Sequence, residues 1–225
     1  MFESSRTTCI HSRRERKALK QITAVLIVIV AVGGEAAAQR TKPAKNAVTR
    51  GWEKAISFQS LPGIRCSTFR NYFVVEQEDK RAVGENILVK HRDSSSGLFR
   101  CAYKVASSDF EIKNGMGNSF LGLLGDLIFV DSGTGANVDG LAIYNLSLRK
   151  KVYEIGIADD EPVEVAGPGK VTLWQPAQGA TKEDCAQYRQ IKAAELQPTL
   201  EKQYILDLTK FTLSPTGQSH CAGYY

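Results

Sequence analysis

The chain has 225 residues, of which 29 are lysine or arginine and 24 are aspartate or glutamate, so its formal net charge is +5. No basic stripe with interleaved aromatic residues is present, which argues against nucleic acid as a partner. A chain of this size can bury one sizeable hydrophobic core, so one domain is the default expectation.

The segment Met1–Ala38 has the features of a secretory signal peptide. Six basic residues precede the apolar run Ile22–Val32, and Ala36-Ala37-Ala38 follows as a small-residue cleavage signal. As a helix, the eleven residues of this run would span only about half of a hydrocarbon core, which disfavours a membrane anchor. We therefore expect cleavage after Ala38, no membrane span in the mature protein, and a periplasmic or secreted location.

Removal of this leader changes the charge of the working protein. Six of the 29 basic and three of the 24 acidic side chains lie before Gln39, so 23 basic and 21 acidic side chains would remain, a net charge near +2. Residues 39–50 are polar and basic and contain Pro43, which indicates a flexible lead-in. Residues 51–225 are then expected to form a single β-rich domain with a C-terminal helix.

Four cysteines remain in the mature chain, and an even number in an exported protein is typical of disulfides. Three pairings are possible, and we favour the two that join neighbours in sequence. A metal site is the alternative, but there is no CxxC spacing and the two histidines of the mature chain lie far apart in sequence. We therefore predict no metal site and no cofactor. The favoured disulfides are Cys66–Cys101 and Cys185–Cys221.

The first half of the mature chain contains short β-like runs separated by turn residues. In the fourth run apolar and polar residues alternate with a period of two, which places Cys101 on the core face. The expected turns are Pro62-Gly63, the charged run Glu76–Arg81 and the polar residues 92–97. The expected strands are Trp52–Phe58, Cys66–Val75, Ile87–His91, Leu98–Val105 and Asp109–Lys113.

The stretch from Gly125 to Ile155 is the centre of the pattern. Its three strand-like runs are separated by Asp131–Gly140, which is dense in turn-forming residues, and by a short turn. This order predicts an antiparallel meander. The three runs are Leu127–Val130, Leu141–Leu146 and Lys151–Ile157.

The last part of the chain predicts one helix between strands. Thr181 is the expected cap of a helix over Ala186–Leu196, and Pro198 marks its end. A last strand over Gln203–Leu213 would then turn at Ser214–Gly217 into a tail that carries Cys221. The fold class predicted for the chain is mostly β, an antiparallel sandwich or open barrel/meander, with one late α-helix.

A short internal similarity connects two of these strands. Ala142–Ser147 and Tyr204–Thr209 each contain an apolar triplet, then Asn or Asp, then Leu and a hydroxyl residue. Two copies do not make a repeat architecture. We interpret them as two strands that each turn at an Asn or Asp.

The segment Phe129–Thr134 resembles the active-site motif of aspartic proteases, in which two apolar residues precede Asp, Thr or Ser, Gly and then Thr or Ser. The resemblance implies that Asp131 would share a proton with a partner aspartate and activate water. A chain with one copy would have to dimerise to supply that partner. The alternative, which we favour, is a structural Asp131 that accepts backbone N–H groups of the following loop.

Three functional hypotheses follow from these observations. We favour a non-catalytic exported protein that binds another macromolecule, a protein or a cell-envelope component, through its loops. The second hypothesis is a carbohydrate or small-molecule binding protein, and the third is an aspartic-type hydrolase at Asp131. The second would use exposed aromatic residues, for which the candidates are Trp52, Trp174, Tyr224 and Tyr225.

Overall fold

The computed structural model describes residues 51–225 except 94–98, 116, 134–137 and 160. All of these residues belong to one compact unit, Ala44–Tyr225. The expected signal peptide, its cleavage site after Ala38 and the lead-in 39–50 lie outside the described residues, as does part of the expected turn at 92–97. Within the described part of the chain, no helix is long and apolar enough to cross a membrane.

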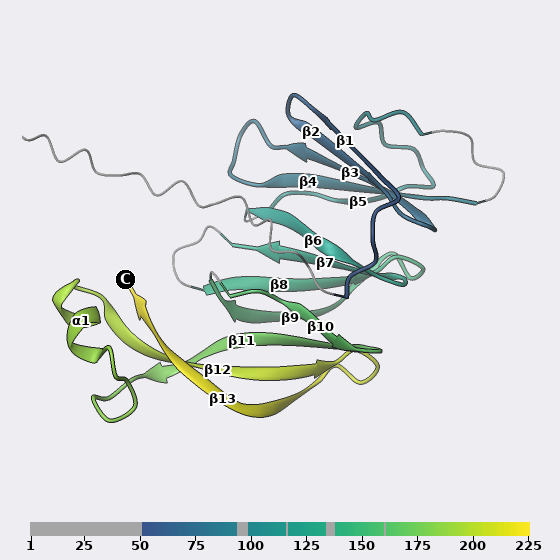
Figure 1. Ribbon diagram of the computed structural model, residues 1–225. Helices are drawn as coiled ribbons and strands as arrows, with labels where there is room; N and C mark the ends of the chain where they lie inside the picture. Colours follow the sequence, from purple (N-terminus) through teal and green to yellow (C-terminus); the bar gives the residue numbers. More distant parts are fainter. Residues whose placement is uncertain (1–50, 94–98, 116, 134–137, 160) are drawn as a thin grey trace, which may run out of the picture. The chain divides into compact units, whose positions relative to one another are not determined.

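The described chain folds into three open sheets whose neighbouring strands are consecutive in sequence and antiparallel (Figure 1). The prediction of a mostly β antiparallel protein with one late helix is therefore confirmed. The first sheet contains β1 (Ser57–Leu61), β2 (Ile64–Thr68), β3 (Tyr72–Glu78), β4 (Glu85–His91) and β5 (Phe110–Ile112). The middle sheet contains β6 (Asn118–Leu124), β7 (Leu127–Ser132), β8 (Val138–Asn145) and β9 (Lys150–Ala158). The last sheet contains β10 (Glu164–Gly167), β11 (Lys170–Gly179), β12 (Gln197–Asp207) and β13 (Thr212–Tyr224).

The middle sheet is covered by apolar side chains on both faces, and β7 shows why. Successive side chains of a strand point to opposite faces of its sheet. Ile128 and Val130 pack into a core shared with the first sheet, whereas Phe129 packs into a core shared with the last sheet. An apolar run without polar interruption is the pattern of a strand buried on both faces, so the predicted meander is confirmed at the centre of the fold.

Trp52 lies in the core between the middle and last sheets, where it is 6% exposed. Its ring meets Phe129 edge to face with centroids 4.6 Å apart. A Cβ at Gly122 would lie 2.8 Å from the indole, so glycine is needed where β6 passes this ring. Two expectations for Trp52 are wrong: the first strand begins at Ser57 and not at Trp52, and the side chain is buried and not exposed.

The disulfide Cys66–Cys101 is present as predicted and fastens a covering segment to the outer face of the first sheet. Both sulfurs lie in a third apolar cluster, in which Phe99 stacks on Phe73 with centroids 5.2 Å apart. The described residues 99–105 form no strand, contrary to the prediction for Leu98–Val105. Their alternating pattern reflects packing onto the sheet instead of pairing within it. Cys101 is buried, as predicted, but because its segment covers the sheet and not because it lies in a strand.

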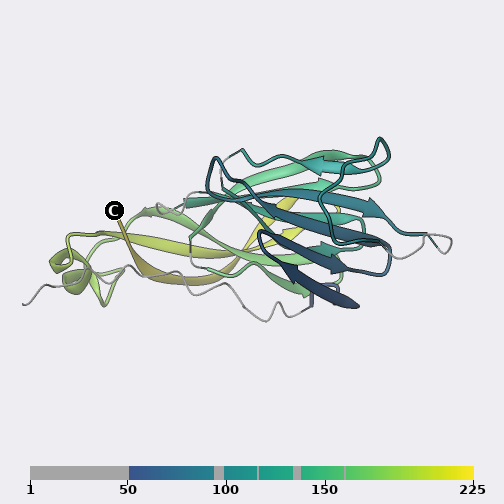
Figure 2. The ribbon, with the colours of Figure 1, turned by 90° about the horizontal axis from the view of Figure 1, so that it is seen from above.

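The second predicted disulfide, Cys185–Cys221, is also present and joins β13 to the segment before the helix. The helix α1 is shorter than predicted, Tyr188–Ala193, and packs on β12 and β13 (Figures 1 and 2). Thr181 does not cap it, since its hydroxyl and N–H both donate to Asp184 in the preceding turn. The N-cap is Gln187, without a side-chain hydrogen bond.

The final hairpin differs from the predicted strand over Gln203–Leu213, because that range spans the turn. The carboxylate of Asp207 accepts N–H groups of Thr209 and Lys210, and Phe211 adopts φ +52°, so the chain reverses between β12 and β13. The same turn closes β8 and β9, where Asn145 accepts the N–H of Leu148. The interpretation of the internal similarity as two Asx turns is therefore confirmed.

Candidate functional site

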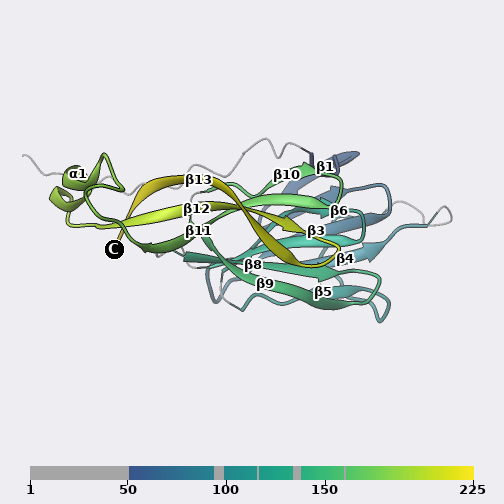
Figure 3. The same cartoon turned by 90° about the horizontal axis from the view of Figure 1, so that it is seen from below.

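Strands β12 and β13 lie side by side in the last sheet (Figure 3), and their register brings separate polar residues together. Ser214–Gly217, predicted as a turn, lies within β13. Ser214 and Pro215 pair with β12, and the bulge that follows them contains Gly217 at φ +84°. The bulge is held by Thr216, whose hydroxyl donates to the carbonyl of Gln203. Beyond it the pairing resumes at Lys202 and Ser219, and Glu201 lies directly opposite His220.

Two of the four aromatic residues predicted as binding candidates lie at this position. Trp174 of β11 is partly exposed and its ring meets the imidazole of His220 with centroids 4.4 Å apart. The hydroxyl of Tyr224 donates to Oε1 of Glu201 at 2.6 Å. Trp52 is in the core, and Tyr225 is 95% exposed at the chain end, so neither belongs to this group.

Glu201 is the centre of the group and, at 2% exposure, the least exposed charged residue among those described. Nε2 of His220 lies 3.1 Å from its Oε2 and 3.2 Å from Oε1 of Glu161, which comes from the connection between β9 and β10. No described donor makes a well-directed hydrogen bond to Oε2 of Glu201. We call these five residues, Glu161, Trp174, Glu201, His220 and Tyr224, the carboxylate cluster.

The electrostatics of the cluster are set by burial. Loss of solvent raises the pKa of Glu201, while the hydrogen bond from Tyr224 and the charge of His220 oppose that rise. The pKa of Tyr224 is raised as well, chiefly by its own burial and then by its hydrogen bond to Glu201. Among the described residues no lysine or arginine forms an ion pair with Glu201. The cluster therefore combines two carboxylates with an imidazole as their nearest basic group.

Sequence reasoning missed Glu161, Glu201 and His220. The two glutamates stand among other polar residues, and His220 lies far in sequence from His91, the other histidine of the mature chain. The pairing of Glu201 with His220 depends on the bulge in β13, which adds residues to one strand only. No spacing in the sequence signals that register. The aromatic residues Trp174 and Tyr224 were the available signal.

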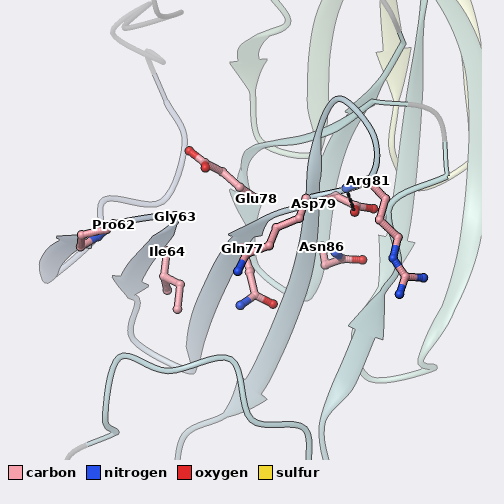
Figure 4. Close-up of a pocket in the computed structure, with 9 residues that line it drawn as sticks. Pro62, Gly63, Ile64, Gln77, Glu78, Asp79, Arg81 and Asn86 are labelled. Carbon is pink, nitrogen blue, oxygen red and sulfur yellow. Dashed lines mark hydrogen bonds between the residues drawn. The ribbon is translucent and has the colours of Figure 1, made fainter.

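A second candidate is a hollow of about 420 Å³ beside the turn between β3 and β4 (Figure 4). Its polar groups already serve the fold, since Asp79 accepts the N–H of Arg81 and Asn86 accepts that of Asn114. Figure 4 shows the side chains of Glu78 and Arg81 pointing in different directions and not toward a common centre. The hollow lacks the convergent polar groups of a binding site, so the carboxylate cluster is the better candidate.

Asp131, the catalytic candidate, lies in the middle sheet. It and Ser132 belong to β7, and not to the loop that was expected to begin at Asp131. Asp131 is 7% exposed, and its backbone is paired with Ser119 and Leu141 on the two neighbouring strands. A Cβ at Gly133 would lie 2.1 Å from the carboxylate of Asp139, so the glycine of the protease-like motif permits this close approach. The structural role proposed for Asp131 stays a prediction.

Comparisons with protein-family models, with curated proteins and with solved structures found no match.

Proposed function

We propose that this protein is an exported, non-catalytic binding protein and that the carboxylate cluster is its binding site. Two disulfides in a β-rich fold are compatible with an oxidising compartment. The expected signal peptide also supports export, because its basic residues, apolar run and alanines are the features of a secretory leader. Binding of a macromolecular or cell-envelope partner through the loops stays a prediction. The same holds for the second hypothesis, a carbohydrate or small-molecule ligand.

The observation that carries the proposal is the burial of Glu201 without a permanent cation. A buried carboxylate is costly unless a charge and hydrogen bonds compensate for the lost water. Even Glu76, which is 5% exposed and has the guanidinium of Arg65 at 2.9 Å, has its pKa raised by burial. Glu201 has only the imidazole of His220, which is 36% exposed at its side chain. A position that lowers stability in this way is typical of a functional site.

The chemistry of the cluster favours a cationic ligand. Glu161 and Glu201 supply negative charge, and Trp174 and Tyr224 are aromatic residues of the kind that attract cations. The side chains of Glu161 and His220 are 30% and 36% exposed, so solvent reaches one side of the group. The ligand would supply the positive charge that Glu201 lacks.

Thermal unfolding of the mature protein with Zn²⁺, Mg²⁺, choline and spermidine tests this assignment. At least one of these cations should raise the Tm, by about 5–10 °C at a concentration of 100 times its Kd. Glu201→Gln should abolish that rise, because the amide oxygen still accepts from Tyr224 but carries no charge. The exposed Glu164 provides the matched control Glu164→Gln, which should keep the rise. An equal rise in Tm for the parent and Glu201→Gln, or no rise in the parent with any of the cations, would refute the proposal.

Export makes a separate prediction about the mature N-terminus. Protein recovered from the periplasm or medium of an expressing cell should begin at Gln39, because cleavage follows the small residues Ala36–Ala38. Intact-mass measurement of the recovered protein checks this. Retention of Met1–Ala38 in all of the exported protein would contradict it.

A further inference from the structure

Three atoms of the carboxylate cluster have the arrangement of metal ligands. Oxygen atoms of Glu161 and Glu201 and Nε2 of His220 all lie within 4.8 Å of one another. They come from three different parts of the last sheet: the connection before β10, strand β12 and strand β13. The disulfide Cys185–Cys221 lies next to His220 and fixes the strand that carries it. Two of the three ligands are thus held on paired strands.

The distances from the imidazole suit a tetrahedral site. Ligand atoms about 2.1 Å from a tetrahedral ion lie about 3.4 Å from each other. Nε2 of His220 lies 3.2 Å and 3.1 Å from the two carboxylate oxygens. Glu161, whose side chain is 30% exposed, is the ligand with room to adjust its position around an ion.

We propose that Glu161, Glu201 and His220 bind a divalent first-row transition-metal ion, with Zn²⁺ as the reference case, and leave a fourth position open. The inference rests on the proposed function and names its ligand. An imidazole nitrogen in the donor set favours Zn²⁺ and its neighbours over Mg²⁺ and Ca²⁺, which prefer oxygen ligands alone. It also revises the expectation from sequence that the chain has no metal site.

The remaining two members of the cluster hold the ligands in place. Tyr224 donates to Oε1 of Glu201 and so leaves Oε2 to face His220 and Glu161. Trp174 packs edge-on against the imidazole with an interplanar angle of 61°. These contacts correspond to the outer-shell interactions that orient metal ligands in known sites. Both are positioning residues in this assignment.

A metal-free explanation exists and makes different predictions. Ion pairs between His220 and the two carboxylates would also account for the distances, with no ligand present. In that case Zn²⁺ would bind no better to the parent protein than to variants that lack one of the three side chains. The experiment must therefore compare matched variants.

Isothermal titration of the oxidised, untagged mature protein with Zn²⁺ supplies that comparison. We expect one site per chain, with affinity lowered at least about 100-fold in His220→Ala and Glu161→Gln, because each removes a ligand. Tyr224→Phe should weaken binding by about 10-fold, in line with other outer-shell changes. The controls are His91→Ala and Glu164→Gln, which remove an exposed histidine and an exposed glutamate outside the cluster and should leave the affinity unchanged. Mg²⁺ should not compete at equal concentration.

Trp174 provides an independent readout of location. Co²⁺ bound at the cluster should quench the fluorescence of Trp174, since the indole lies against His220. The quenching should be lost in Trp174→Phe, which retains only Trp52 in the core, and in His220→Ala.

Binding that survives in His220→Ala and Glu161→Gln, or an absence of Zn²⁺ binding to the folded parent, would overturn the metal assignment. If Zn²⁺ fails but choline or spermidine stabilises the parent and not Glu201→Gln, only the metal assignment falls. If no cation stabilises the parent, both the metal assignment and the proposed function are refuted.

Discussion

Replacing Cys66 and Cys101 together by alanine is expected to lower the free energy of unfolding by about 4–5 kcal/mol. The disulfide closes a loop with a sequence separation of 35, and the chain-entropy model assigns about 4 kcal/mol to a loop of this length. The remainder comes from packing, because both cysteines lie in the apolar cluster on the outer face of the first sheet. Urea unfolding of the oxidised proteins measures the difference.

The second disulfide supplies the matched control for this experiment. Cys185–Cys221 has nearly the same sequence separation, 36, and Cys185 is buried, but Cys221 is only partly buried and neither cysteine belongs to a described core cluster. Its replacement should therefore cost the same entropic part, about 4 kcal/mol, with a smaller contribution from packing. A smaller loss for the Cys66–Cys101 variant than for the Cys185–Cys221 variant would contradict the packing argument.

Glu76 is expected to make the protein less stable as the pH rises from about 5 to 9. Its carboxyl is buried in β3, and burial raises its pKa to about 8, with Arg65 opposing the rise and Glu85 adding to it. The folded state thus binds the proton more tightly than the unfolded state does. The stabilisation is complete below the ordinary pKa of 4.5 and is lost as the pH rises through about 8.

Glu76→Gln removes this titration and should flatten the pH dependence of stability. The parent should lose about 3–5 kcal/mol more than the variant between pH 5 and pH 9, according to the size of the pKa shift. The control is Glu78→Gln, which changes an exposed glutamate of the same strand and should follow the parent curve. Urea unfolding at unit steps of pH checks this, and parallel curves for the parent and Glu76→Gln would show that Glu76 stays ionised in the fold.

The fold could be predicted best where one physical effect dominates. The run Leu127–Val130 is apolar on both faces because its side chains pack into two cores, and this continuous apolar pattern allowed the middle sheet to be predicted. The hairpin between β1 and β2 turns at Pro62-Gly63, with Gly63 at φ +70°, so local turn chemistry identified it. The disulfides were predictable because each joins cysteines close in sequence.

Errors arose where tertiary packing or register overrides local pattern. Trp52 looked like part of a strand and a surface aromatic, but Gly122 leaves room for it inside the fold. The strand predicted over Gln203–Leu213 ignored the Asx turn at Asp207, although the similarity to Asn145 pointed to it. The carboxylate cluster needs both that turn and the bulge at Gly217 to align Glu201 with His220. Long-range register of this kind is not encoded in any short motif.

The middle sheet, apolar on both faces, has a consequence for how the chain acquires its structure. During synthesis or export the first sheet emerges before the residues that cover its inner face, so it cannot complete that core alone. The other face of the middle sheet stays uncovered until β11 and β12 have been added. A chain cut at either boundary between sheets would expose a full apolar face and aggregate. The three sheets must therefore consolidate as one cooperative event, with the amide protons of β7 and β8 the slowest to exchange with solvent.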